Sequence, residues 1–395
     1  NNTAVGKSAL SAGCGDNNVA IGSGALNATT GTDNTAVGKD AGVAVTSGVE
    51  NTLIGKSAGD ALTDADYNVA MGSSALTSDT LGSRSVAIGQ EALSNQNFTT
   101  ATDTYNTAVG FLAGKLVTTG SQNTLIGGLA GDAITTGDYN VALGRSALST
   151  NTASNTNVAI GGQSLADFNV TTDTDTHNVA VGYATGAAMT TGVLNTLIGG
   201  LAGDALTTAD ENVTVGYNSL STNTKSFYNV AVGSRSLAAH NISSADTAGY
   251  NTAVGTAAGA AITTGINNTL IGGLSGDLMT TGNNNVGVGI SSISGGTVTG
   301  NDNTGVGSAA GFALSSGINN SFFGHDAGRT GSPGGNITSA NNTIVLGDDN
   351  VGACHIQTDW TVASDQRDKT DFTALDLGLD FVKALAPVTY KWDKR

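Results

Sequence analysis

The sequence predicts an all-β fold, an elongated parallel β-solenoid (β-roll) of about twenty coils, each of roughly 16–17 residues. A short motif, Asn-Thr/Val-Ala/Leu-Val/Ile-Gly, recurs along the chain, mostly at intervals of about 17 residues. The composition agrees, with 57 glycines, only 2 prolines and 5% aromatic residues. A short period with frequent turn residues and small apolar side chains is typical of stacked coils with a thin core.

The motif defines the individual coils and a longer period. Longer gaps of about 21–22 residues follow Ser85, Asn157, Asn229 and Asn320. The first three gaps mark a period of four coils, about 72 residues. The twenty motif starts, with a degenerate one at Ser85, are Asn2, Asn18, Asn34, Asn51, Asn68, Ser85, Asn106, Asn123, Asn140, Asn157, Asn178, Asn195, Asn212, Asn229, Asn251, Asn268, Asn285, Asn303, Asn320 and Asn342.

Each motif position has an expected role. The second and fourth residues, such as Thr35 and Val37, are β-branched and share one face of a strand, so we expect them to fill the coil interior. The middle residue, such as Ala36, is also apolar and is expected to meet another copy of the chain, because a strand that is apolar on both faces is buried on both. The opening Asn is expected to form a ladder between coils, and the closing Gly a sharp, left-handed turn.

The rest of each coil has two alternative structures. Segments such as 89–93 and 127–133 space Ala and Leu so that either a second short strand or one helical turn fits. The Gly-Gly-Leu-Ala-Gly-Asp run at 127–132 is expected to be a turn, since no Lys-Ser or Lys-Thr follows as in a phosphate loop. The long gaps are expected to protrude and to offer contact with a receptor. Strand spacing gives a rod on the order of 95 Å long.

Charge and composition exclude several classes of function. The net charge is −16, nearly all of it on the repeat region, where Lys and Arg occur singly, so nucleic-acid binding is not expected. No apolar run approaches the ~20 residues of a membrane-spanning helix. Regular repeats with few aromatic residues give little support to a polysaccharide-cleaving enzyme, so we expect no enzymatic activity on other molecules.

No cofactor or metal site is expected either, because the four histidines are scattered and are assigned to solvent-exposed or coil-edge positions. Five of the eight tyrosines directly precede a motif Asn, which indicates packing at a corner of the coil; a sugar-binding platform is the alternative. These five are Tyr67, Tyr105, Tyr139, Tyr228 and Tyr250.

The motif resembles repeats of known fibrous proteins. The run Asn-Asn-Val-Ala-Ile-Gly at 17–22 is similar to the head repeats of trimeric autotransporter adhesins. The resemblance implies a left-handed parallel β-roll that associates as a parallel homotrimer. Arrays with coils of this greater length look like those of bacteriophage tail fibres and appendages.

The C-terminal residues carry a second resemblance. We divide the chain into the solenoid, 1–351, and a linker with a truncated chaperone-like segment, 352–395. Residues 360–369, Trp-Thr-Val-Ala-Ser-Asp-Gln-Arg-Asp-Lys, resemble the start of the peptidase S74 intramolecular chaperone, which guides fibre trimerisation and then cuts itself off. The resemblance implies a helix over 374–385, a strand over 387–392, and autocleavage with Ser364 as nucleophile and Lys369 as base.

The sequence therefore favours a structural fibre in a virion tail or another extracellular location. The expected partners are two further copies of the chain, other virion tail proteins, and a glycan or protein receptor on the host surface. The alternative is a bacterial surface adhesin or extracellular filament built on the same repeat. Because the chain opens on Asn1, we expect it to be a fragment or a processed form.

Overall fold

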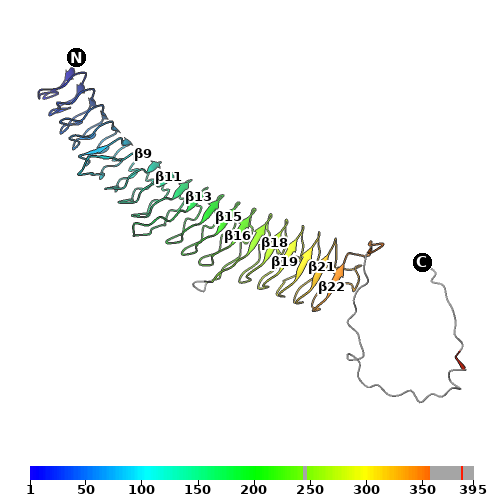
Figure 1. The fold of residues 1–395 in the computed structure, drawn as a ribbon. Coiled ribbons are helices and arrows are strands. Elements are labelled where there is room, and N and C mark those ends of the chain that lie inside the picture. The colour runs from blue at the N-terminus through cyan, green and yellow to red at the C-terminus, as the bar shows by residue number, and fades with distance from the viewer. Residues whose placement is uncertain (243–246, 356–383, 386–395) are drawn as a thin grey trace. The chain divides into compact units, whose positions relative to one another are not determined.

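A computed structural model describes residues 1–242, 247–355 and 384–385. The chain divides into two units, residues 1–350 and 351–395. The first unit is a parallel β-solenoid in which 20 short strands, one per coil, form a single sheet (Figure 1). The predicted fold class is confirmed, and no helix occurs in residues 1–242 or 247–355.

The strands of this sheet are β1 Thr3–Val5, β2 Val19–Ile21, β3 Thr35–Val37, β4 Thr52–Ile54, β5 Val69–Met71, β7 Val86–Ile88, β9 Thr107–Val109, β10 Thr124–Ile126, β11 Val141–Leu143, β12 Val158–Ile160, β13 Val179–Val181, β14 Thr196–Ile198, β15 Val213–Val215, β16 Val230–Val232, β17 Thr252–Val254, β18 Thr269–Ile271, β19 Val286–Val288, β20 Thr304–Val306, β21 Ser321–Phe323 and β22 Ile344–Leu346. A second sheet pairs β6 Gly82–Ser83, just before the first long gap, with β8 Thr102–Asp103, near the end of that gap.

Successive coils stack in register, so equivalent motif positions form rows along the solenoid. Ala36 of β3 pairs with Leu53 of β4, for example, and Leu53 pairs with Ala70 of β5. The last coil departs from the predicted register by one residue, because Ser321 of β21 pairs with Ile344. Thr343, not Asn342, therefore takes the motif Asn position.

The motif Asn residues form a buried ladder along the solenoid, as predicted. The side-chain Oδ1 of Asn34 accepts the backbone N–H of Asn51 at 3.0 Å and its Nδ2–H at 3.0 Å. Asn51 Nδ2 also donates to the backbone carbonyl of Ala65 at 2.8 Å. Both side chains are fully buried. Each Asn thus supplies the donors and acceptors that a thin coil cannot obtain from water.

Ser85 interrupts this ladder, and neighbouring residues repair it. The Ser85 hydroxyl bonds to the Thr104 hydroxyl at 2.6 Å and accepts Gln96 Nε2 at 2.8 Å. The Gln96 Oε1 accepts Asn106 Nδ2 at 2.9 Å. The longer Gln side chain therefore replaces the amide that a motif Asn would have supplied.

The two faces of the strands are the reverse of those predicted. The middle residues, such as Ala36 and Leu53, are fully buried in the coil interior, whereas Thr35 and Val37 lie on the outside and are half-buried. The reason is the two-residue period of a strand, since the middle residue shares its face with the buried Asn before the strand. Ala or Leu fills this position in most coils, and Phe322 fills it in β21.

The second arm of the coil is neither the strand nor the helical turn that the sequence left open. It is a chain of turns in which every second residue has a left-handed backbone, as at Asp40 (φ 58°) and Gly42 (φ 58°). Its amides bond to neighbouring coils, with Asp40 N–H to Ser23 O at 2.8 Å and Gly42 N–H to Ala58 O at 3.0 Å. The 127–132 run lies in the same arm, which confirms its prediction as a turn.

The closing glycines permit the sharp turn after each strand. Gly216 has φ +138°, and a Cβ at this position would lie 2.6 Å from the backbone of Gly233 in the next coil. A side chain is therefore excluded both by backbone conformation and by the close approach of the coils.

Candidate functional site: the outer sheet face and the C-terminal coils

The outward face of the sheet is an uncharged stripe. The fourth motif position holds a large apolar residue in all twenty strands, and the second position holds Thr, Val, Ser or Ile. No charged residue occurs at either position of these strands, although the chain has a net charge of −16. Nine residues of the fourth row are among the most exposed large apolar side chains: Val5, Ile21, Met71, Leu143, Ile198, Ile271, Val306, Phe323 and Leu346.

The uncharged stripe covers a large area. Three-residue strands stacked about 4.8 Å apart over twenty coils give a strip about 10 Å wide and about 90 Å long, or about 900 Å². The largest apolar patch on a monomeric protein is typically about 300–600 Å². An area of about 800 Å² per partner is usual for a stable protein–protein interface. Ten of the twenty residues at the second position are Thr or Ser, so the apolar part of this area is centred on the fourth position. The whole stripe has the size of an interface and carries no charge.

The five tyrosines that precede a motif Asn lie at an exposed corner of the coils, and all but Tyr139 make ring contacts there. The Arg84 guanidinium lies 4.7 Å from the centre of the Tyr67 ring and 6.0 Å from that of Tyr105. The rings of Tyr228 and Tyr250 stack at 5.2 Å. For these four tyrosines the contacts support the predicted packing role, since a cation or a neighbouring ring occupies a ring face that a sugar would need.

Each long gap places one apolar side chain against the stack. Each carries an Asn-apolar-Thr/Ser sequence whose apolar residue is buried or half-buried; these residues are Phe98, Val170, Ile242 and Ile337. In the second gap, the Asn169 side chain accepts the Thr152 N–H at 3.2 Å and the Thr152 hydroxyl at 2.8 Å. In this gap the Asn side chain thus ties the segment to the preceding coil.

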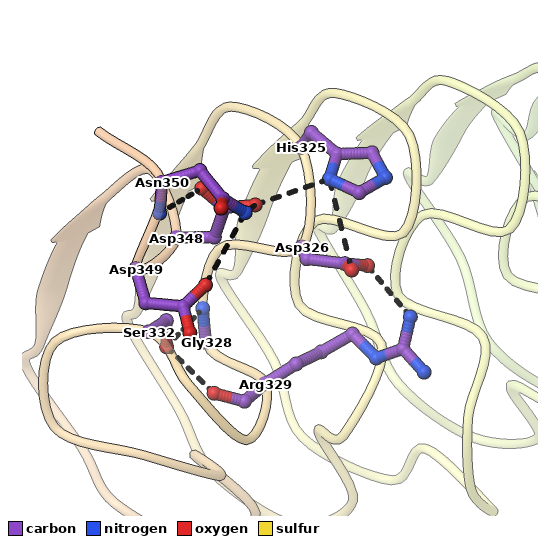
Figure 2. Close-up of polar contacts among 8 residues, drawn as sticks. All are labelled: His325, Asp326, Gly328, Arg329, Ser332, Asp348, Asp349 and Asn350. Atoms are coloured by element: carbon purple, nitrogen blue, oxygen red, sulfur yellow. Dashed lines mark hydrogen bonds and ion pairs between the residues drawn. The ribbon is translucent and has the colours of Figure 1, made fainter. Parts of the chain in front are cut away.

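The last two coils bring together a histidine and two carboxylates (Figure 2). His325 and Asp348 each follow the closing Gly of their coil, so Asp348 stacks over His325, and Asp326 is the next residue along the chain. His325 Nδ1 lies 3.3 Å from Asp348 Oδ2 and 3.6 Å from Asp326 Oδ2. Sequence reasoning missed this cluster because one of the long gaps separates the two coils.

Neighbouring polar groups orient the two carboxylates, as Figure 2 shows. Arg329 Nη1 donates to Asp326 Oδ1 at 2.6 Å. The Asn350 side chain donates to Asp348 Oδ2 at 3.1 Å and its backbone N–H to Asp348 Oδ1 at 3.0 Å. The Asn350 bonds, together with His325, lower the pKa of Asp348 below its usual value. Asp348 is therefore ionised at neutral pH.

A pocket of about 460 Å³ adjoins this cluster. Phe312 and Asn336 line it, and Arg329 lies 4.6 Å from the Phe312 ring centre. The Arg329 charge already pairs with Asp326, so the pocket wall offers polar contacts without an unpaired cation.

The prediction that all four histidines lie at solvent or coil edges is wrong for His240. This ring is fully buried, with Nε2 3.2 Å from the Ser226 hydroxyl. Burial lowers its pKa from 6.5 to about 4. His240 occupies the place that Phe168 fills one four-coil period earlier, so this core position holds an aromatic ring in both coils.

The predicted autocleavage residues Ser364 and Lys369 lie outside the described residues, as do the strand predicted over 387–392 and all but the last two residues of the helix predicted over 374–385. Among residues 1–242, 247–355 and 384–385, we find no helical segment with the length and hydropathy of a membrane span.

Comparison with known proteins identifies the C-terminal segment. Residues 364–395 match the family peptidase S74, described as chaperone of endosialidase. No curated protein matches the chain. The matched residues include both Ser364 and Lys369. The chain therefore joins a parallel β-solenoid to a C-terminal segment similar to the chaperone of endosialidase, a combination that fits a structural protein of the phage tail-fibre kind.

Proposed function

We propose that the chain is a fibre protein of a bacteriophage tail or related appendage, and that it forms a parallel homotrimer which acts as a rigid spacer. The observation that supports this most directly is the uncharged outer stripe, with a large apolar residue at the fourth position of all twenty strands of the main sheet. Burial of such a face against another chain is favourable because it removes apolar side chains from water. The charged residues that give the chain its net charge of −16 lie elsewhere.

The trimeric state and the parallel arrangement rest on the two resemblances. The head repeats that this motif resembles associate as trimers, and the S74 chaperone assembles trimers from one end of the fibre. In a parallel arrangement, three identical stripes face one another over their full length and the three C-terminal segments gather at one end. The sheet faces that meet are those of the second and fourth positions, with the middle residues inside each coil.

The mass of the assembly in solution tests this proposal. Light scattering is expected to give three times the chain mass of 38.9 kDa. A double variant, Ile198→Lys with Ile271→Lys, places two charges on the stripe and is expected to yield monomer. The control, Leu116→Lys with Leu278→Lys, alters residues of similar exposure on the turn arm and is expected to stay trimeric. A wild-type mass of one chain contradicts the proposal.

We also propose that the trimer binds a receptor on the host surface. The gap segments recur at four positions along the solenoid and offer the sites for contact with a glycan or protein receptor. Binding of the fibre to host cells, competed by the isolated trimer, tests this role. A bacterial adhesin or extracellular filament is the alternative, and an intact gene that encodes a signal peptide and a membrane anchor would favour it.

A further inference from the structure

We infer that His325, Asp326 and Asp348 form a zinc site that fastens the last coil of the solenoid to the coil before it. The inference depends on the geometry of the three side chains and not on the oligomeric state. The ligand atoms are one imidazole nitrogen and two carboxylate oxygens, and all lie within 4.8 Å of one another.

The spacing of these atoms suits a tetrahedral ion. Zinc binds nitrogen and oxygen ligands at about 2.0–2.2 Å, so two ligands at a tetrahedral angle lie about 3.4 Å apart. The observed separations from His325 Nδ1, 3.3 Å to Asp348 and 3.6 Å to Asp326, bracket that value. A small shift of side chains at the surface completes three ligands and leaves the fourth position for water.

The chemistry of the ligands selects the kind of ion. Calcium and magnesium prefer sites made of oxygen atoms alone, whereas an imidazole favours zinc and its transition-metal neighbours. Three carboxylates gather at this point, those of Asp326, Asp348 and Asp349, against the single guanidinium of Arg329. A divalent cation balances the two remaining negative charges. Arg329 and Asn350 hold the two ligand carboxylates in place, as outer residues do in many metal sites.

The other coils provide an internal comparison. The residue after the closing Gly forms a row, which reads Ser234, Thr256, Gly273, Ile290 and Ser308 in the five coils before His325. None of these residues is a usual metal ligand. The row changes to His and then Asp in the last two coils, where the solenoid ends.

The location gives the ion a structural role. A terminal coil has a neighbour on one side only, so it is the least stable part of a repeat array. The outer residues of β22, Ile344 and Leu346, are exposed. Zinc bound by Asp348, His325 and Asp326 would link the last coil to the coil before it and so stabilise the C-terminal end of the solenoid.

Zinc titration of the full chain tests the site, with a chromophoric chelator as competitor. We expect one zinc per chain, and at least tenfold weaker binding in His325→Ala and in the conservative variant Asp348→Asn. His177→Ala removes an exposed histidine from another coil and is expected to bind as wild type. Cobalt in place of zinc is expected to give the intense visible absorption of tetrahedral coordination, and His325→Ala to lose it.

Amide exchange tests the fastening of the last coil. Zinc is expected to slow the exchange of residues 344–347 at least tenfold in the wild type and not in His325→Ala. The inference is overturned if the wild type binds no stoichiometric zinc or if His325→Ala binds zinc equally well. An absence of zinc-dependent protection at 344–347 overturns the structural role.

Discussion

The Asn ladder leads to a quantitative prediction for Asn195→Ala. In the structure, Asn195 Oδ1 accepts the backbone N–H of Asn212 at 3.0 Å, and Asn195 Nδ2 donates to the carbonyl of Ala209 at 2.8 Å. The substitution leaves both backbone groups buried without these partners. An unsatisfied buried group costs about 1–3 kcal/mol, so the variant is expected to lose about 4 kcal/mol of unfolding free energy.

Denaturant unfolding at a fixed protein concentration measures this loss, and amide exchange over residues 205–215 shows whether it is local. Exchange is expected to rise most at Asn212. The control is Asn267→Gly, which removes an exposed Asn at a left-handed position (φ 60°) and is expected to change stability by about 0.5 kcal/mol or less. A loss below about 1 kcal/mol in Asn195→Ala, with unchanged exchange at Asn212, would refute the ladder as a source of stability.

Three further predictions follow from the glycine turns, the buried histidine and the S74-like segment. Gly216→Ala is expected to destabilise the solenoid by at least about 3 kcal/mol, whereas Gly273→Ala, with no atom within 4 Å of its added Cβ, is expected to be near neutral in thermal melts. Because the pKa of His240 falls from 6.5 to about 4 on folding, the unfolded chain takes up a proton first as the pH drops. Stability is then full above pH 6.5, and about 3 kcal/mol is lost by pH 4; His240→Phe is expected to remove this part of the pH dependence in parallel melts. In a chain extended by the complete S74 domain, we predict cleavage next to Ser364 that Ser364→Ala and Lys369→Ala each abolish, and a processed band from either variant on a denaturing gel would reject the assignment.

The sequence was sufficient to predict the coils, their parallel stacking and the Asn ladder, because each depends on a local pattern repeated about twenty times. The strand faces were predicted wrongly from side-chain shape, since Thr35, Ala36 and Val37 are all acceptable on either face of a strand. The buried ladder decides the question, because alternate strand residues share a face and the motif Asn is therefore on the same side as Ala36. The one-residue register shift in the last coil could have been predicted from the sequence. The motif Asn position lies four residues before the closing Gly in the other coils, and Thr343 lies four residues before Gly347.

Other features could not be predicted because they depend on which coils become neighbours across a gap of unusual length. Gln96 repairs the ladder from a gap segment, and nothing local in its sequence indicates that role. His325 and Asp348 are neighbours because β22 pairs in register with β21 despite the long gap between them, so the residues after the two closing glycines stack. The stretch with Ser364 and Lys369 was identified by its sequence alone, and the family match over 364–395 agrees with it.

The in-register contact between neighbouring coils has a consequence for the evolution of this solenoid. Each coil touches only the coils next to it, and coils four steps apart present nearly the same surfaces, as at β4, β10, β14 and β18, which all read Thr-Leu-Ile. Unequal recombination between two such blocks deletes or duplicates one four-coil period and rejoins equivalent surfaces. The solenoid then becomes shorter or longer by four coils, a step of about 19 Å. No new core packing has to evolve, because the rejoined coils make the same contacts as before.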